Sequence, residues 1–460
     1  MDESIPLLIL GAGPKGTALW TKHTVLKGLG LIVPPLVIFE KKQIGSYWRG
    51  DDGFTDGMQF LVTPSEQDLG YPYALEHPNR QTAIKIRDAM LQYSWMQYLL
   101  SKNAYCKWVL TERPRAPHYE FVDYLSWAAN RSGLKRTESG ISEFSVKDGN
   151  WWLRQESKSE LVEGIGLVIT GSGEPRRLED QPTIHPRLLD GRTFWKNLTE
   201  FENLTYARVA VIGAGETAAA IAAAALEKIE DVDTCSIDLI CKQNAYFTRG
   251  QIQKDLRFFS DPTGWNKLSE GRRLSIIRRA DRGVVSAMIK DKLEDSTVVE
   301  YTNADVLAIK DSGATKLTLK LQYEDGDIDE IPYDFVIVAT GFNPLWFIEL
   351  FESGVQNNFF EHLFHEMSEE RKKHLAKVLG TTTSDRNVVA SWITNRNKKN
   401  VSKITERVVS DLIDSDLSLR GFVPRLHLPM LAGLAQGPGF PNLNCLGLIS
   451  DRIFAHYMKL

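Results

Sequence analysis

The sequence predicts an α/β protein that contains two similar strand–turn–helix–strand units and a small helical region. Three observations support this prediction. An apolar run at residues 7–10 stops in a glycine-rich turn, and a second run at 208–212 stops in a turn of the same pattern. Each turn is followed, after an equal distance, by another short apolar run. Apolar runs that end abruptly in glycines are typical of buried parallel strands that lead directly into a helix.

The first turn has the pattern G-x-G-x-x-G, formed by Gly11, Gly13 and Gly16. In dinucleotide-binding proteins the first glycine allows the tight turn, the second lets the backbone approach a pyrophosphate, and the third lets the helix pack against the strand. The next apolar run ends at Glu40, 24 positions after Gly16. A carboxylate there accepts hydrogen bonds from an adenosine ribose. We therefore predict a dinucleotide site in this unit.

The second unit repeats the pattern as G-x-G-x-x-A, from Gly213 and Gly215 to Ala218, with Glu216 and Thr217 in between. The helix expected after it consists almost entirely of alanine, whose small side chain allows close packing of a helix on a sheet. We assign both glycines, Glu216 and Thr217 to a second dinucleotide site.

The two units differ at the end of their second strand. Lys242 lies 24 positions after Ala218 and occupies the place that Glu40 has in the first unit. A carboxylate suits a free ribose 2′-hydroxyl, whereas a cation suits a 2′-phosphate. This contrast predicts FAD in the first unit and NADPH in the second. Arg249 is a second candidate for the phosphate, and the alternative for Lys242 is a solvated surface lysine.

Three further segments are expected to contact the cofactors. The aromatic-rich segment 44–80 follows the ribose-binding position and is predicted to line the flavin ring, with a plain surface excursion as the alternative. The apolar run in 333–342 predicts the crossing back to the flavin domain. The Gly-, Pro- and Asn-rich segment 436–447 opens the last helix and offers backbone donors. The residues that we assign to the cofactors in these segments are Trp48, Gln59, Thr340, Gly341, Pro441 and Asn442.

Composition excludes several functional classes. A hydrophobic content of 43% and a charged content of 25% are those of an ordinary globular protein, and a net charge of −4 gives no electrostatic case for nucleic acid. No apolar stretch is long enough for an integral membrane segment, and the acidic start does not resemble a signal peptide. The four cysteines have no C-x-x-C or metal-ligand spacing. We expect a cytoplasmic protein that binds no metal. The sequence is compatible with a homo-oligomer.

The order of the motifs predicts three parts. Residues 1–200 form the first part of an FAD domain, 201–335 form an NADPH domain, and 336–460 return to the FAD domain. A helical substrate region is expected at about 345–420. Two Rossmann-like dinucleotide-binding domains in one chain indicate that electrons pass from NADPH to FAD. Because no redox-active C-x-x-C is present, we expect O2 to receive them as co-substrate.

The chain resembles the flavin-dependent N-hydroxylating monooxygenases of siderophore biosynthesis, and among them most of all the lysine N6-hydroxylases of mycobactin-type assembly. The resemblance covers nearly the whole chain, and the C-terminal motif is its most specific piece. The segments that carry it are Asp56-Gly57, Asp68 to Tyr73, Tyr93 to Trp95, Gly213 to Ala218, Phe247 to Gly250, Phe259 to Pro262, Asp281 to Val284, Gln436 to Gly447 and Ser450 to Arg452.

The resemblance implies that NADPH reduces FAD, O2 is activated, and a primary amine takes one oxygen atom. The amine must be uncharged. From a reference pKa near 10.4, deprotonation at pH 7 to 8 costs roughly 4 kcal/mol, and burial in an apolar pocket can supply much of that free energy. Exclusion of water would also slow the unproductive release of hydrogen peroxide. The mechanism requires no dedicated general base, so we assign no catalytic residue.

Two departures from the family concern the substrate. The amino-acid hydroxylases usually carry a carboxylate-binding lysine before the aspartate that matches Asp68, where this sequence has Gln67. A typical asparagine before Phe259 corresponds to Leu256. Asp281 fits as the partner of a distant ammonium, either the α-amine of lysine or the far end of a diamine. The substrate residues that we predict are Gln67, Leu256, Asp281 and Asn444.

The leading prediction is N-hydroxylation of the terminal amine of L-lysine. A diamine such as putrescine or cadaverine is the main alternative, because Gln67 and Leu256 remove polar partners for an amino-acid head group, and an unpaired buried carboxylate is unfavourable. L-Ornithine is a further alternative. More remote are a carbon- or sulfur-oxygenating flavin monooxygenase and a non-catalytic flavoprotein that binds a partner.

Overall fold

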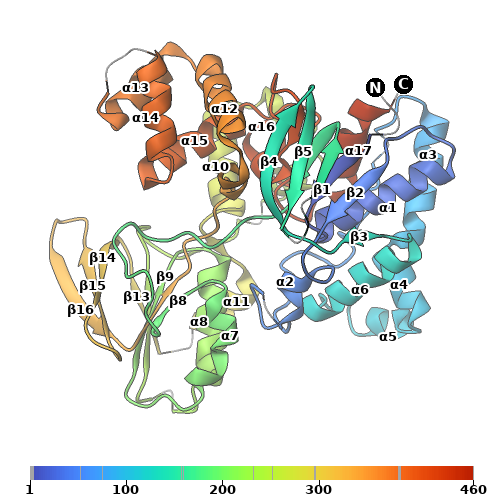
Figure 1. The fold of residues 1–460 in the computed structure, drawn as a ribbon. Coiled ribbons are helices and arrows are strands. Elements are labelled where there is room, and N and C mark those ends of the chain that lie inside the picture. Colours follow the sequence, from blue (N-terminus) through green and yellow to red (C-terminus); the bar gives the residue numbers. More distant parts are fainter. Residues whose placement is uncertain are drawn as a thin grey trace.

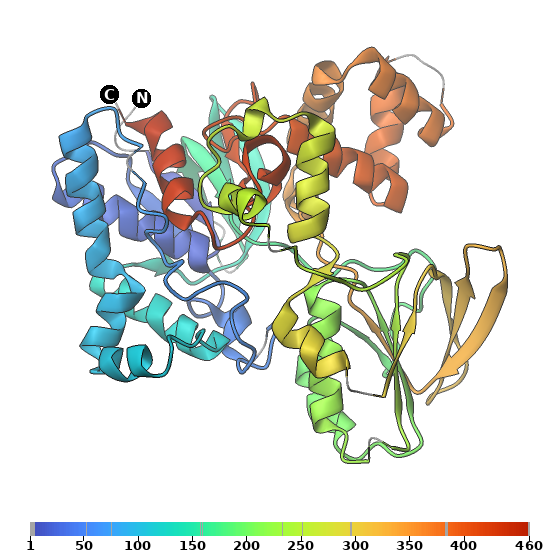
Figure 2. The same cartoon turned by 180° about the vertical axis from the view of Figure 1, so that it is seen from behind.

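The computed structural model describes residues 5–51, 53–74, 76–156, 158, 160–231, 233–250, 252–294, 297–381 and 385–458. These residues form an α/β fold with two parallel sheets, as the sequence predicts (Figure 1). The two ends of the chain lie close together beside helices of the first sheet, and Figure 2 shows the same arrangement from behind.

The first sheet has the strand order β18-β7-β1-β2-β3, and all its strands are parallel. Its central strand β1 pairs Leu7 with Leu36 on one side and with Gly166 on the other. Every residue of β1 is buried, which explains why the strand is an unbroken apolar run. The strands are β1 (Leu7–Leu10), β2 (Leu36–Phe39), β3 (Arg136–Thr137), β7 (Gly166–Ile169) and β18 (Arg425–His427).

The second sheet has the order β13-β10-β9-β17-β8 and is also parallel. Its strands all lie between β7 and β18 in the sequence, so one sheet is nested within the other. They run from residue 188 to residue 338, and β17 pairs with β9 before the chain returns to the first sheet. The strands are β8 (Leu188–Asp190), β9 (Arg208–Ile212), β10 (Ser236–Ile240), β13 (Val298–Tyr301) and β17 (Phe335–Val338).

Smaller sheets flank these two. Two are antiparallel and each has three strands in the described residues, whereas β11 and β12 form a short parallel pair. The strands are β4 (Ile141–Lys147), β5 (Asn150–Gln155), β6 (Leu161–Gly164), β11 (Phe247–Thr248), β12 (Val284–Val285), β14 (Asp305–Asp311), β15 (Leu317–Gln322) and β16 (Ile328–Tyr333).

Most helices pack beside the two sheets, and those between residues 353 and 411 form a separate group at the top of Figure 1. Helices α1 (Pro14–Gly28), α6 (His118–Arg131) and α17 (Leu446–Tyr457) pack together beside the first sheet, and α8 (Glu216–Lys228) packs with α11 (Ala287–Glu294) beside the second. The predicted helical region 345–420 contains α12 (Ser353–Glu366), α13 (Glu369–Leu379), α14 (Asp385–Asn395) and α15 (Lys399–Asp411). The remaining helices are α2 (Ser46–Arg49), α3 (Arg80–Met90), α4 (Trp95–Ser101), α5 (Tyr105–Leu110), α7 (Thr193–Lys196), α9 (Gln253–Leu256), α10 (Glu270–Ala280) and α16 (Gly433–Gln436).

The helical segment from residue 80 to residue 101 is interrupted at Ser94. This residue has extended backbone angles, and its side chain accepts a hydrogen bond from the Gln97 N–H, so it starts a new helix, α4. A search of the described residues finds no helix that is both long and apolar enough to cross a bilayer.

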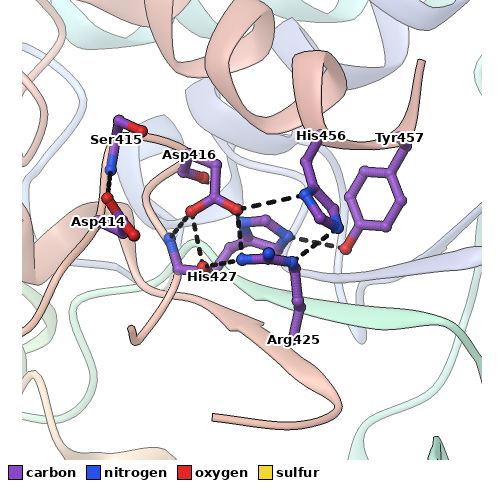
Figure 3. A network of polar contacts seen from close by, with 8 residues as sticks. Asp414, Ser415, Asp416, Arg425, His427, His456 and Tyr457 are labelled. Atoms are coloured by element: carbon purple, nitrogen blue, oxygen red, sulfur yellow. Dashed lines mark hydrogen bonds and ion pairs between the residues drawn. The ribbon is translucent and has the colours of Figure 1, made fainter. Parts of the chain in front are cut away.

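A polar network connects β18 to the loop at residues 414–416 and to α17 (Figure 3). The Arg425 guanidinium donates to the Asp416 carboxylate at 2.7 Å and to the His456 ring at 2.6 Å. The buried His427 ring has Nδ1 at 2.9 Å from the Asp416 carbonyl oxygen and Nε2 at 2.8 Å from the Tyr457 hydroxyl. Because a carbonyl oxygen can only accept, Nδ1 carries the proton of the neutral ring and Nε2 accepts from Tyr457.

This network makes stability depend on pH. Burial lowers the pKa of His427 to about 4, from an ordinary 6.5. Between these two values the unfolded chain binds more protons, so the free energy of unfolding should fall as pH drops from 6.5 towards 4 by up to about 1.36 kcal/mol per unit. Urea unfolding across this range should show a shallower pH slope for His427→Asn, whose amide can still donate to the Asp416 carbonyl.

The exposed His365 provides the control, since His365→Asn should keep the wild-type slope. Burial raises the pKa of Asp68 to about 6, which acts in the opposite direction between pH 6 and its ordinary value. The prediction therefore concerns the difference between the variants. Equal slopes for wild type and His427→Asn would contradict it.

The contact between β1 and α1 predicts a second effect on stability. A Cβ atom at position 16 would lie 2.1 Å from the Gly11 carbonyl oxygen, so any side chain there must push the helix away from the strand. Gly16→Ala should lower the free energy of unfolding by about 1–3 kcal/mol, the usual range for overpacking. Gly28→Ala, at the end of the same helix with no atom within 4 Å of the added Cβ, is the control. Equal midpoints of denaturation for the two variants would refute this account of Gly16.

Candidate functional site

A cavity of about 590 Å³ lies at the carboxyl edge of the first sheet. Its lining includes the residues that directly follow three strands: Gly11 after β1, Glu40 after β2 and Thr170 after β7. Ligands of parallel α/β sheets bind at this edge, and the volume lies within the range of small-molecule and cofactor sites.

The glycines of the first turn each have a physical reason. Gly11 has φ +104°, and a Cβ there would lie 2.6 Å from the Thr170 hydroxyl oxygen. Gly13 lines the cavity, and a Cβ at this position would meet no protein atom within 4 Å. A side chain at 13 would therefore occupy the space in front of α1, where the free N–H groups of the helix attract an anion. These features fit a pyrophosphate, as the sequence predicts.

Glu40 also lies where the prediction requires it. Its carboxylate lines the cavity and accepts hydrogen bonds from the N–H groups of Ala12, at 3.0 Å, and Lys42, at 2.9 Å. Both bonds hold the carboxylate beside the first turn. The remaining acceptor capacity of the two oxygens is available to a ribose hydroxyl.

The sequence analysis missed Lys15. This buried lysine lines the cavity, and its ammonium donates to the Pro441 carbonyl oxygen at 2.7 Å. Burial lowers the pKa of Lys15 to about 8. Its contact joins the first turn to the C-terminal segment 436–447 across almost the whole chain. The position of a cation inside G-x-G-x-x-G was the only signal in the sequence.

The C-terminal segment contributes Pro441, Asn442 and Asn444 to the cavity lining. The Asn442 amide donates to the Asp281 carboxylate at 2.8 Å and to the Pro438 carbonyl oxygen at 2.9 Å. Asp281 itself lines neither of the two cavities described here, and burial raises its pKa. The structure thus pairs Asp281 with a residue of the larger cavity.

Two residues assigned to the flavin side have different positions. Trp48 lines the larger cavity and stacks on the His118 ring, with the ring centroids 4.9 Å apart. Gln59 lines neither cavity, and its amide donates to the Asp56 carboxylate at 3.3 Å. Sequence adjacency alone could not separate the two residues, because the segment has no regular period.

A second cavity, of about 480 Å³, adjoins the first. Val62, Thr63, Arg249 and Asn444 line both cavities, so the two spaces share a wall or an opening at these residues. A molecule in the smaller cavity therefore lies next to whatever fills this end of the larger one.

Three of the four predicted substrate residues line this smaller cavity: Gln67, Leu256 and Asn444. The Asn444 amide donates to the Gln67 side-chain oxygen. Next to Gln67, the buried Asp68 carboxylate accepts from the Trp95 N–H at 2.8 Å and from the Tyr73 hydroxyl at 2.8 Å. These bonds fix the loop that presents Gln67.

Two arginines also line the smaller cavity. Arg249, the second candidate for the phosphate, lines both cavities, whereas Arg115 lines only the smaller one. The sequence analysis missed Arg115, which lies in a loop between two prolines and carries no motif. Among the lining residues, all of which are described, none is an aspartate or glutamate.

The second turn has the geometry of the first. Gly213 has φ +149°, and a Cβ there would lie 2.4 Å from the Ala339 carbonyl oxygen, next to the end of β17. An added Cβ at Gly215 would meet only the Gly283 nitrogen, at 4.0 Å, which leaves the start of α8 open. The Glu216 carboxylate accepts hydrogen bonds from the Ser286 N–H at 2.6 Å and hydroxyl at 2.7 Å. Thr217 follows in the first turn of α8.

Three more of the residues assigned to the cofactors, namely Lys242, Thr340 and Gly341, line neither cavity. Lys242 follows β10 and forms an ion pair with Asp305. Thr340 and Gly341 follow β17 at the carboxyl edge of the second sheet, and the Gly341 carbonyl oxygen accepts from the Arg176 N–H at 2.9 Å. All three therefore belong to the second sheet in this structure.

Comparison with known proteins identifies relatives over nearly the full length. L-Lysine N6-monooxygenase MbtG of Mycobacterium sp. (strain MCS) is 31% identical over 452 residues, which cover 97% of this chain and 94% of the relative. The structure of the lysine monooxygenase NbtG from Nocardia farcinica is 30% identical, with a TM-score of 0.75 over 98% of this chain and 99% of NbtG. DfoA, a cadaverine monooxygenase from Erwinia amylovora bound to FAD, has a TM-score of 0.69 over 99% of this chain and 95% of DfoA, but at 14% identity it supports the fold alone.

The family model described as L-lysine 6-monooxygenase/L-ornithine 5-monooxygenase matches residues 83–344, more than half of the chain. Together with the two relatives at 30% identity or more, this match confirms the resemblance seen in the sequence. The chain therefore belongs to the L-lysine 6-monooxygenase/L-ornithine 5-monooxygenase family.

Proposed function

We propose that this protein uses FAD, NADPH and O2 to hydroxylate the terminal amine of L-lysine for a hydroxamate siderophore or a related natural product. Membership of the family supports the reaction class. MbtG and NbtG, which are both lysine monooxygenases, support the substrate.

The observation that carries the proposal is the charge of the smaller cavity. It adjoins the dinucleotide cavity and is lined by Arg115 and Arg249, with no carboxylate among its lining residues. Oxygen transfer needs the nitrogen lone pair, so the amine must lose its proton. Nearby cations and partial burial both lower an amine pKa, and a carboxylate beside it would raise that pKa. The cavity therefore favours the neutral amine.

The residues of the larger cavity fit FAD. Gly11 and Gly13 would present the start of α1 to the pyrophosphate, Glu40 would hold the ribose, and Asn442 would line the same cavity from the C-terminal segment. When bound, FAD supplies the electrons that activate O2 for transfer to nitrogen. The domain assignment follows from this fit: the first sheet with its returning strand β18 forms the FAD domain.

NADPH fits the second sheet by the same reasoning. The turn at Gly213 and Gly215 leaves the start of α8 open for a pyrophosphate, as the first turn does for α1. Lys242 follows β10, at the position expected to contact the ribose. To bind a 2′-phosphate, its ammonium would have to exchange the ion pair with Asp305 for one with the phosphate. Arg249, between the two cavities, is the second candidate for a contact with NADPH.

One observation favours the diamine alternative. Gln67 and Leu256 both line the smaller cavity, and neither provides a cation for a substrate carboxylate. Against it, Asp281 does not line that cavity and so offers no carboxylate to a second ammonium.

The proposed reaction predicts a specific product pattern. With FAD and NADPH, the protein should form a hydroxylamine from L-lysine and less from L-ornithine, putrescine and cadaverine. N6-acetyl-lysine should also give less product, because its acetylated nitrogen has no basic lone pair. The measurement is hydroxylamine formed per NADPH oxidised, since NADPH loss alone includes hydrogen peroxide release. Product from cadaverine or putrescine but none from L-lysine would refute the lysine proposal and favour a diamine.

The proposed FAD site predicts different effects for two glycines. Gly13→Ala adds a methyl group that meets no protein atom, so the unliganded protein should keep its stability while its affinity for FAD falls by at least tenfold. Fluorescence titration with FAD gives the affinity, and urea unfolding of the FAD-free protein gives the stability. Gly28→Ala is again the control. Unchanged FAD affinity in Gly13→Ala would place the pyrophosphate elsewhere.

A further inference from the structure

Arg115 has no partner in this structure. Its side chain is half-buried at the smaller cavity, and it forms no hydrogen bond, ion pair or cation–π contact with any residue that the structure describes. Arg249, the other arginine of this cavity, likewise has a buried Nε without a hydrogen-bond partner among the described residues, whereas Arg272 and Arg279 both bind the buried Asp255 carboxylate, at 2.9 Å and 2.7 Å. A partly buried cation without a counter-ion is unfavourable unless a ligand supplies one.

The chemistry of Arg115 indicates the class of ligand. A guanidinium presents N–H groups in a planar fork that matches the two oxygens of a carboxylate, and such bonds are stronger than neutral ones. No aspartate or glutamate lines the cavity to compete for these donors. The cavity is thus prepared for a molecule with an anionic end.

The two arginines are not equivalent. Arg249 lines both cavities and also experiences the charge of Asp281, so it belongs to the side where the two spaces meet. Arg115 lines the smaller cavity and not the larger one. A substrate whose amine reaches the junction can therefore place its opposite end at Arg115.

Gln67, at the position where the family usually has a carboxylate-binding lysine, does not provide a charge for an anion. The Gln67 side-chain oxygen accepts the hydrogen bond of the Asn444 amide, and a neutral amide carries no positive charge for an anion. Leu256, on the other wall, has no polar group at all.

We propose that Arg115 binds the α-carboxylate of the substrate and so selects an amino acid over a diamine that lacks this group. The inference rests on the proposed function, because it places the reacting amine at the junction of the two cavities. Arg115 then provides the charge that the family's usual lysine provides elsewhere, from a loop that is distant in sequence from Gln67.

The test compares L-lysine with cadaverine, which has the same terminal amine and no carboxylate. Calorimetric titration of the FAD-loaded protein should show tighter binding of L-lysine. In Arg115→Met the dissociation constant for L-lysine should rise roughly 10- to 100-fold, the usual value of a charge-assisted hydrogen-bonded pair, while that for cadaverine stays the same or falls. Arg115→Lys should restore part of the L-lysine affinity. Arg113→Met, an exposed neighbour in the same loop that lines neither cavity, should behave as wild type.

Kinetics separate a substrate role from a cofactor role. With L-lysine, Arg115→Met should raise KM and leave both kcat and the rate of flavin reduction by NADPH close to wild type. Equal loss of affinity for L-lysine and cadaverine, or a raised KM for NADPH with an unchanged KM for L-lysine, would overturn the proposal. If the wild type binds L-lysine through Arg115 but hydroxylates no amine, the proposed reaction fails while the role of Arg115 stands.

Discussion

The contact between the turn after β1 and the first turn of α1 determines where the rest of the site can lie. Gly16 faces the Gly11 carbonyl oxygen so closely that no side chain fits between the strand and the helix. This contact points the open end of α1 at the cavity, beside the residues that end β2 and β7. Gly13 leaves that end free, and Glu40 is held beside it by the Ala12 N–H. The carboxyl edge of the sheet therefore becomes an anion-binding surface next to a carboxylate for ribose.

The C-terminal segment completes the site from the opposite end of the chain. The Lys15 ammonium donates to the Pro441 carbonyl oxygen, and the buried Lys22, two turns further along α1, forms an ion pair of 2.6 Å with Asp451 in α17. These contacts set the segment that supplies Asn442 and Asn444 against α1. The same segment forms part of the wall of the smaller cavity, so the packing of α17 on α1 couples the cofactor end of the site to the substrate end.

The two cavities differ in the charge of their lining residues. Glu40 and Lys15 lie in the larger one, where both signs serve a dinucleotide, whereas the smaller one has arginines and no carboxylate. An amine that enters the smaller cavity meets no group that would keep it protonated. In the proposed binding mode, a carboxylate on the same molecule pairs with Arg115, whose side chain has no partner among the described residues. This arrangement suits an amino acid that must be held at one end and neutral at the other.

The features that depend on local interactions could be predicted from the amino-acid sequence. The glycines of both turns, Glu40 and the buried strands that carry them are specified by neighbours within a few dozen residues, because strand burial and turn geometry leave a periodic and compositional pattern. The resemblance to the family and the segment 436–447 were also visible at this level.

Which distant residues share a cavity became visible in the folded chain alone. Arg115, Lys15 and the pairing of Asn442 with Asp281 depend on contacts between segments that are far apart in the sequence, and no local pattern records such contacts. For the same reason, no local pattern shows that β17 pairs with β9 or that Gln59 lines neither cavity. A short apolar run indicates a buried strand but not its neighbour, and a side chain next to a motif is not thereby next to the ligand.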